Sequence, residues 1–162
     1  MITPEELDRV EFVRNLGGPY AGQLAALAQP RDYPAGAEIF RQGPDSPYLY
    51  FVLDGEVALE VHVSGQEAAE IHRGGPGELF GWSPVLGRRS MTATGRTTAP
   101  TRMAVLEIAR VLELCERDPR FASAFYRQVA TVLASRLDDT RRQLSHHLPR
   151  RSLSGQPAQG SD

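Results

Sequence analysis

Residues 31–108 carry a hydrophobic pattern of period two that glycine and proline break at short intervals. In the stretch 57–63, VALEVHV, every second residue is valine or leucine, which is typical of a strand with one buried face. Residues 48–53 are nearly all apolar, as in a strand buried on both faces, and Asp54–Gly55 predicts a hairpin turn after it. About seven or eight short strands at this spacing indicate a β-sandwich or jelly roll rather than a parallel sheet.

Helical signals flank the β-rich region on its N-terminal side. Thr3, Pro4 and Glu6 have the spacing of a capping box with proline at the first helical position. The sequence Gly-Gly-Pro at 17–19 breaks the pattern, and we expect a second short helix that stops at Pro30.

A longer helix is predicted on the C-terminal side. Asp118 and Pro119 read as its N-cap and first residue, and apolar residues recur along it with helical spacing: Phe121, Phe125, Val129, Val132, Leu133, Leu137 and Leu144. We therefore expect one domain over residues 1–144, with the β-region at about 31–108 and helices over 109–144. Residues 145–162 are polar and rich in Ser, Pro and Gly, which predicts a disordered tail.

Composition excludes several classes of function. The chain has 20 acidic and 18 basic residues, a net charge of −2, which disfavours a non-specific nucleic-acid binder. Every basic residue is arginine, so lysine Schiff-base chemistry and a Walker-type phosphate loop are excluded. The single cysteine, Cys115, lies in a helical pattern and is expected to be a core residue of a protein in a reducing compartment. Without a long apolar run or a signal-peptide pattern, we expect a cytoplasmic protein.

The stretch 77–94, GELFGWSPVLGRRSMTAT, has the composition of an anion-binding loop. Glycine at position 81 frees the backbone to turn, and Arg89 and Ser90 supply a guanidinium and a hydroxyl side by side. Backbone N–H groups, a hydroxyl and a guanidinium directed at one point suit an anionic oxygen, above all a phosphate.

Two motifs give the chain a resemblance to a known family. The first is Ile39-Phe40-x-x-Gly43 followed by the apolar run 49–52 and Gly55; the second is Phe80–Gly81 followed by Arg89–Ser90. In both, the chain resembles the cyclic nucleotide-binding domain family, the sensor module of catabolite-activator-like proteins, over residues 7–144. The resemblance implies a mainly β fold, a double-stranded β-helix or jelly roll, with N-terminal helices and a long C-terminal helix.

The resemblance also implies a site. Arg89 would clamp the cyclic phosphate, Ser90 would be its hydroxyl partner, and the 81–83 backbone would frame the ribose. The ligand would be cyclic AMP or cyclic GMP, bound without catalysis and without a metal. The predicted ligand-binding residues are Phe80, Gly81, Trp82, Ser83, Arg89, Ser90 and Met91.

Three departures from the family pattern support an alternative. Trp82 replaces the glutamate that accepts the ribose hydroxyl, and an indole donates one hydrogen bond but accepts none, a loss of about 1–3 kcal/mol. The segment 85–89 is shorter than usual, and Met91 replaces a small residue and could fill the phosphate space. The alternative is a degenerate domain, closed by Trp82 and Met91, that serves as a dimerisation or protein-interaction scaffold.

Several individual residues have alternative interpretations. Arg89 could pair with Glu78 instead of a ligand, Arg88 could take its place if the loop shifts, and Trp82 could stack on a flat ligand or plug an apolar gap. A cupin-like metalloenzyme is a third hypothesis, but strand alternation predicts that His62 and His72 point outward into solvent rather than into the roll.

The C-terminal helix suggests the partners. Leu133, Leu137 and Leu144 could pair with a second copy in a homodimer through residues 119–144. Arginines between 136 and 151 are expected on a solvated face rather than in a nucleic-acid patch. No helix-turn-helix is expected after residue 144, so any output would pass through dimerisation or a separate effector protein.

Overall fold

The structure is a computed structural model that describes residues 1–88 and 90–148. Its strands form two four-stranded antiparallel sheets, with orders β1-β8-β3-β6 and β2-β7-β4-β5. The strands are β1 (Gln29–Tyr33), β2 (Glu38–Phe40), β3 (Tyr48–Asp54), β4 (Val57–Val61), β5 (Ala69–Gly74), β6 (Leu79–Phe80), β7 (Thr94–Thr97) and β8 (Thr101–Glu107). The predicted β-roll with flanking helices is confirmed.

Strand β3 explains why the molecule has two cores. Its side chains alternate, so that Leu49 and Phe51 join a core between the sheet and the helices, while Tyr50 and Val52 join a core between the two sheets. Both rows are buried, as the apolar run predicted. The roll is therefore filled with side chains on the inside and covered by helices on one side.

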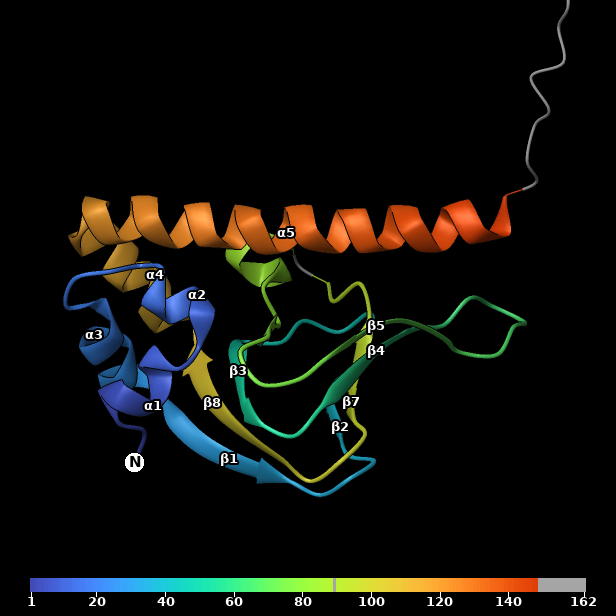
Figure 1. The fold of residues 1–162 in the computed structure, drawn as a ribbon, viewed down its shortest axis with the longest axis horizontal. Helices are drawn as coiled ribbons and strands as arrows, with labels where there is room; N and C mark the ends of the chain where they lie inside the picture. The colour runs from blue at the N-terminus through green and yellow to red at the C-terminus, as the bar shows by residue number, and fades with distance from the viewer. Residues whose placement is uncertain (89, 149–162) are drawn as a thin grey trace, which may run out of the picture.

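The first four helices gather at one end of the roll, and the C-terminal helix begins there and extends over the length of the roll (Figure 1). The helices are α1 (Pro4–Asp8), α2 (Glu11–Arg14), α3 (Tyr20–Leu27), α4 (Ile108–Arg117) and α5 (Pro119–His147). The capping box at Thr3 is present, and the Asp118 carboxylate accepts from the backbone N–H groups of Arg120 and Phe121. Both predicted helix starts are confirmed, because capping depends on residues close in sequence.

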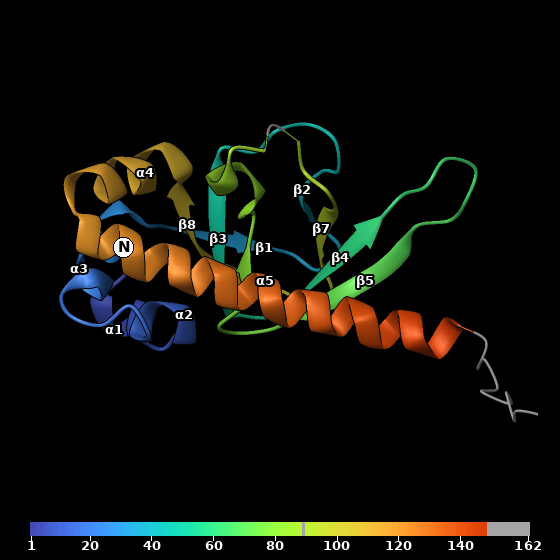
Figure 2. The ribbon, with the colours of Figure 1, turned by 90° about the horizontal axis from the view of Figure 1, so that it is seen from above.

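Helix α5 is 29 residues long, about 43 Å at the standard rise, and crosses the whole molecule (Figure 2). Its first half is anchored by Phe121, Phe125 and Val129, which are buried in the helical core. Its second half passes over strand β5 and the turn before β6. In the described part of the chain, no helix is both long enough and apolar enough to cross a membrane.

Several local expectations were wrong. Asp54–Gly55 does not form a hairpin, because β3 and β4 belong to different sheets and the turn carries the chain from one to the other. Strand β1 begins at Gln29, soon after α3 and ahead of the start predicted for the β-region at about residue 31. Residues 145–147 form the last turn of α5 rather than the start of a tail, and residues 149–162 lie outside the described residues.

Candidate functional site

Five of the predicted ligand-binding residues line one small cavity. Its volume is about 30 Å³, and its wall is built from strands β2, β4 and β6, the segment after β6, the segment before β7, and helix α5. The lining residues are Phe40, Leu59, Phe80, Gly81, Trp82, Ser83, Met91, Thr92, Ala93 and Arg136. The two halves of the anion-loop motif therefore do face each other.

Gly81 makes the turn from β6 into this wall. Its φ is +81°, and a Cβ there would lie 2.6 Å from the carbonyl oxygen of Tyr48 and 3.0 Å from the Tyr50 ring. Only glycine fits both the left-handed backbone and the close approach. A short 3-10 helix, Ser83–Leu86, follows and ends at Gly87, so the chain can return towards β7.

The other predicted ligand-binding residues differ in how deeply they are buried. Phe80 and Met91 are buried in the core between the sheets, and Ser83 is buried as well. Trp82 is half-buried and packs against the helical core, as the gap-filling interpretation expected. Ser90 is exposed, and Arg89 lies outside the described residues.

A residue that sequence reasoning assigned to a solvated face, Arg136, is largely buried at this cavity. Its guanidinium carbon lies 4.7 Å from the centre of the Phe80 ring, within cation–π range. One terminal nitrogen donates to the carbonyl oxygen of Leu79 and, at 3.3 Å, to a carboxylate oxygen of Glu78. The Nε of Arg136 is buried without a partner among the described residues.

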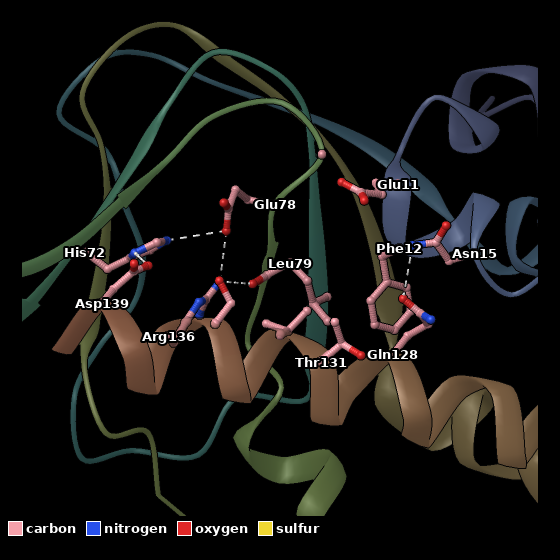
Figure 3. Close-up of a pocket in the computed structure, with 13 residues that line it drawn as sticks. Glu11, Phe12, Asn15, His72, Glu78, Leu79, Gln128, Thr131, Arg136 and Asp139 are labelled. Carbon is pink, nitrogen blue, oxygen red and sulfur yellow. Dashed lines mark hydrogen bonds and ion pairs between the residues drawn. The ribbon is translucent and has the colours of Figure 1, made fainter. Parts of the chain in front are cut away.

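Glu78 also contacts a histidine that the alternation pattern assigned to solvent. The Nε2 atom of His72 lies 3.4 Å from the carboxylate of Glu78, and its Nδ1 atom lies 3.9 Å from Asp139 on α5 (Figure 3). His72 lies opposite Leu59 of the core between the sheets, its ring centre is 6.2 Å from that of Phe80, and only 15% of its side chain is exposed. The expectation of a solvated histidine was wrong for His72, whereas His62 is exposed.

These contacts set the electrostatics of the site. The hydrogen bond from His72 and the charge of Arg136 hold the pKa of Glu78 below its usual range. Burial lowers the pKa of Arg136, and Glu78 opposes that effect. Glu78 is therefore the anionic partner of Arg136 in this structure. The sequence analysis had considered Glu78 as a partner of Arg89.

A sequence signal for Arg136 exists in the helix periodicity. Phe125 and Val129 are buried and Val132 is partly buried, and their row continues with helical spacing to Arg136, Asp139 and Gln143. The prediction followed the leucines Leu133, Leu137 and Leu144 instead, which leave this row. The face of α5 that contacts the roll changes from apolar to polar, and hydrophobicity alone misses that change.

A larger polar groove adjoins the small cavity on the other side of Arg136. It has a volume of about 280 Å³ and lies between α2, the turn before β6, and α5 (Figure 3). Asn15 and Gln128 meet across its far end, at 3.4 Å. Among residues 1–88 and 90–148, no group of three His, Cys, Asp or Glu side chains is arranged to hold a metal ion.

Comparisons with known proteins place the chain in a family. Residues 30–118 match the family described as "Cyclic nucleotide-binding domain". The cyclic AMP receptor protein of Thermus thermophilus is 36% identical over 110 residues, 67% of this chain and 49% of that protein. The chain spans about half the length, or less, of the relatives that it matches in sequence.

Solved structures agree with the sequence match. The catabolite activator protein of Thermus thermophilus has a TM-score of 0.69 at 29% identity, over 84% of this chain and 62% of that one. A cyclic nucleotide-binding domain from Methylobacillus flagellatus reaches 0.80 at 18% identity, over 93% of this chain and 86% of that one, a likeness of fold. From its family match, which spans most of the roll and α4, the chain belongs to the cyclic nucleotide-binding domain family.

Proposed function

We propose that this chain is a regulatory module that binds a cyclic nucleotide, or a similar small anion, without catalysing a reaction. The observation that carries the proposal is the meeting of the 80–83 and 91–93 segments with the Arg136 guanidinium at one cavity. A guanidinium at the end of a turn rich in backbone N–H groups favours a phosphate-like ligand. Arg89 and Ser90, between the two segments, are the proposed phosphate partners.

The cavity has to enlarge before such a ligand enters. It measures about 30 Å³, whereas small-molecule sites typically have about 300–1,000 Å³. Arg136 forms one wall from α5, so movement of α5 away from β6 is the direct way to add volume. Ligand binding and the position of α5 are then coupled, because the ligand selects the displaced helix.

We further propose a homodimer through α5. One row of residues recurs along α5 in steps of four and three, and all of them except the partly buried Leu133 are exposed: Tyr126, Ala130, Leu133, Leu137, Thr140 and Leu144. Leu137 is 50% exposed and Leu144 is 55% exposed, although both are large apolar residues. This is the spacing of the a and d positions of a two-stranded coiled coil. A dimer in the cytoplasm that signals to a separate effector protein is the arrangement we propose.

Fluorescence and calorimetry test the ligand. Trp82 is the only tryptophan, and it lines the cavity, so its emission reports binding directly. Titration with cyclic AMP and cyclic GMP is expected to release or absorb heat and to change this emission. Arg89→Ala is expected to weaken binding by at least ten-fold, while the exposed neighbour variant Arg88→Ala leaves it unchanged. No heat at high micromolar nucleotide, with no change in emission, would refute the proposal.

The small volume of the cavity favours one second candidate. A domain closed by Trp82 and Met91 acts as a dimerisation scaffold, and its state does not depend on a nucleotide. Sedimentation of the protein with and without each cyclic nucleotide separates the two functions. The scaffold predicts the same dimer in every case and a monomer for Leu137→Asp, whereas the sensor predicts a nucleotide-dependent change in shape.

A further inference from the structure

A separate cavity opens at one edge of the roll. It is lined by β1 and β2, which are edge strands of the two sheets, and by the loop that leads from β2 into β3. We call it the edge cavity. Its volume is about 270 Å³, close to the lower end of the range of small-molecule sites. Among the described residues, it shares only Phe40 with the small cavity at Trp82, so it is a distinct place on the molecule.

The edge cavity contains a half-buried guanidinium, that of Arg31. The guanidinium carbon lies 4.4 Å from the centre of the Tyr48 ring, so the planar group is held against an aromatic surface. Across residues 1–88 and 90–148, Arg31 forms no ion pair, whereas Arg96 on β7 and Arg102 on β8 each pair with two carboxylates. A stacked arginine without a carboxylate partner can offer its N–H groups to an oxyanion.

Hydroxyl groups and flat apolar surfaces form much of the remaining lining. Ser46 and Tyr50 are both buried and both line the edge cavity. Burial raises the pKa of Tyr50, so its phenol is protonated at neutral pH and can donate a hydrogen bond. Phe40, Pro44 and Pro47 add rings to the wall. The edge cavity therefore combines a cation and hydroxyl donors with a surface on which a flat group can lie.

The loop that forms one wall of the edge cavity, residues 41–47, is held at both ends. The backbone N–H of Gly43 donates to the carbonyl oxygen of Met91 at 2.9 Å. At the other end, the carbonyl oxygen of Pro47 accepts from the backbone N–H of Ile108 at 2.9 Å. A wall that is already ordered loses less conformational entropy when a ligand binds.

We propose that the edge cavity binds a small organic oxyanion, a phosphate monoester or a carboxylate that carries a flat apolar group. Arg31 binds the oxyanion, and the hydroxyls of Ser46 and Tyr50 are the hydrogen-bond donors near it. The apolar group of the ligand lies against the rings of the wall. The proposal concerns a second site, and it does not depend on the binding of a cyclic nucleotide at the small cavity.

Two other charged residues line the edge cavity and modify its affinity. Arg41 is exposed, and its Nε donates to the carboxylate of Glu38 at 2.9 Å, so its charge is partly neutralised. Asp45 is exposed as well, and its negative charge opposes the binding of an anion. Arg31 is therefore the cation on which binding depends, and removal of the Asp45 charge should strengthen it.

Backbone NMR of the full chain, titrated with phenyl phosphate and with benzoate, tests this inference. Saturable shifts are expected for the amides of residues 45, 46 and 48, which form the wall next to Arg31. The neutral analogue benzamide is expected to cause none. Tighter binding of phenyl phosphate assigns the site to phosphate monoesters, and tighter binding of benzoate assigns it to carboxylates. The absence of saturable shifts with both anions would overturn the inference.

Three variants show whether Arg31 holds the anion. Arg31→Met keeps an apolar stem on the Tyr48 ring and is expected to weaken binding about ten-fold or more. Arg110→Met, the same change at an exposed residue of α4 outside the edge cavity, is the matched control and should bind as the wild type does. Asp45→Asn should tighten binding about two-fold, a gain that a misfolded variant cannot give.

Equal affinity of Arg31→Met and the wild type, with matching unfolding curves by circular dichroism, would also overturn the inference. Arg89→Ala separates this site from the proposed nucleotide site. It should leave the binding of phenyl phosphate or benzoate at residues 45–48 unchanged, whether or not it affects cyclic AMP. Loss of these shifts in Arg89→Ala would place the anion elsewhere and refute the assignment to the edge cavity.

Discussion

The contact between Arg136 and Glu78 gives the sharpest test of how α5 is attached. Arg136→Met keeps the stem of the side chain over the Phe80 ring but removes the guanidinium from Glu78 and from the carbonyl oxygen of Leu79. The substitution also removes the buried Nε of Arg136, which has no hydrogen-bond partner among the described residues. Its removal offsets part of the loss in the free energy of unfolding.

The size of the effect follows from the burial of the pair. Arg136 is 14% exposed and Glu78 is 38% exposed, so the pair lies between a surface pair, worth up to about 1 kcal/mol, and a buried one. We expect Arg136→Met to lower the free energy of unfolding by about 1–2 kcal/mol, which is roughly 3–6 °C in Tm for a chain of this size. In a cycle with Glu78→Gln, the coupling energy should be about 1 kcal/mol.

Chemical denaturation of the four proteins in the cycle, followed by circular dichroism, measures this coupling. The control is a second cycle on the same helix with Arg141→Met and Asp138→Asn, an exposed pair 3.9 Å apart. There we expect a coupling close to zero. If the Arg136 cycle also gave additive effects within about 0.3–0.5 kcal/mol, Arg136 would be a solvated residue after all, and the account of the site would be refuted.

Three further predictions concern pH, packing and reactivity. Because the pKa of Glu78 is lowered on folding, its ionisation stabilises the folded chain at pH values above the unfolded pKa, near 4.5. This stability should disappear as pH falls through the folded pKa. In acid denaturation, Glu78→Gln should therefore lose less free energy of unfolding than the wild type. Phe125→Ala should cost about 3–5 kcal/mol in denaturant unfolding, because Phe125 is fully buried and packs against three other rings, whereas Val63→Ala at an exposed position should cost less than about 0.5 kcal/mol. Burial raises the pKa of Cys115 to about 11, so a thiol reagent at pH 8 should label the unfolded chain and leave the native chain largely unlabelled; rapid native labelling would contradict this packing.

The features that sequence predicted well depend on neighbours along the chain. The capping box at Thr3 and the N-cap at Asp118 need only residues within one helical turn, and residues 48–53 of the buried strand β3 are nearly all apolar. The turn at Asp54–Gly55 shows the limit of such signals. A left-handed glycine serves a hairpin and a crossing between sheets equally well, and here a side chain on Gly55 would overlap Thr101, a contact that only the folded chain defines.

The site shows the same limit more strongly. The residues from 80 to 91 could be chosen from sequence because they form one continuous motif, and the cavity does bring five of them together. Arg136 was not chosen, because it comes from a helix 45 or more residues away and its charge predicted exposure. The helix periodicity places Arg136 in the same row as Phe125 and Val129, but the ion pair that it forms depends on which part of the roll that row contacts, and composition does not determine this.

The double role of Arg136 sets a limit on ligand affinity. The same guanidinium holds α5 to Glu78 and Leu79 and forms the wall of the cavity, so a ligand that needs the cavity open has to work against those contacts. If undocking costs about 1–2 kcal/mol, only about one molecule in 5 to 30 is open before the ligand arrives, and the apparent affinity falls by the same factor. A ligand anion that itself engages Arg136 recovers part of this cost, because it replaces Glu78 as the partner of the guanidinium. Mutations that weaken the docking of α5 without touching the cavity wall, such as Asp139→Asn, should therefore tighten nucleotide binding, whereas Arg136→Met should not.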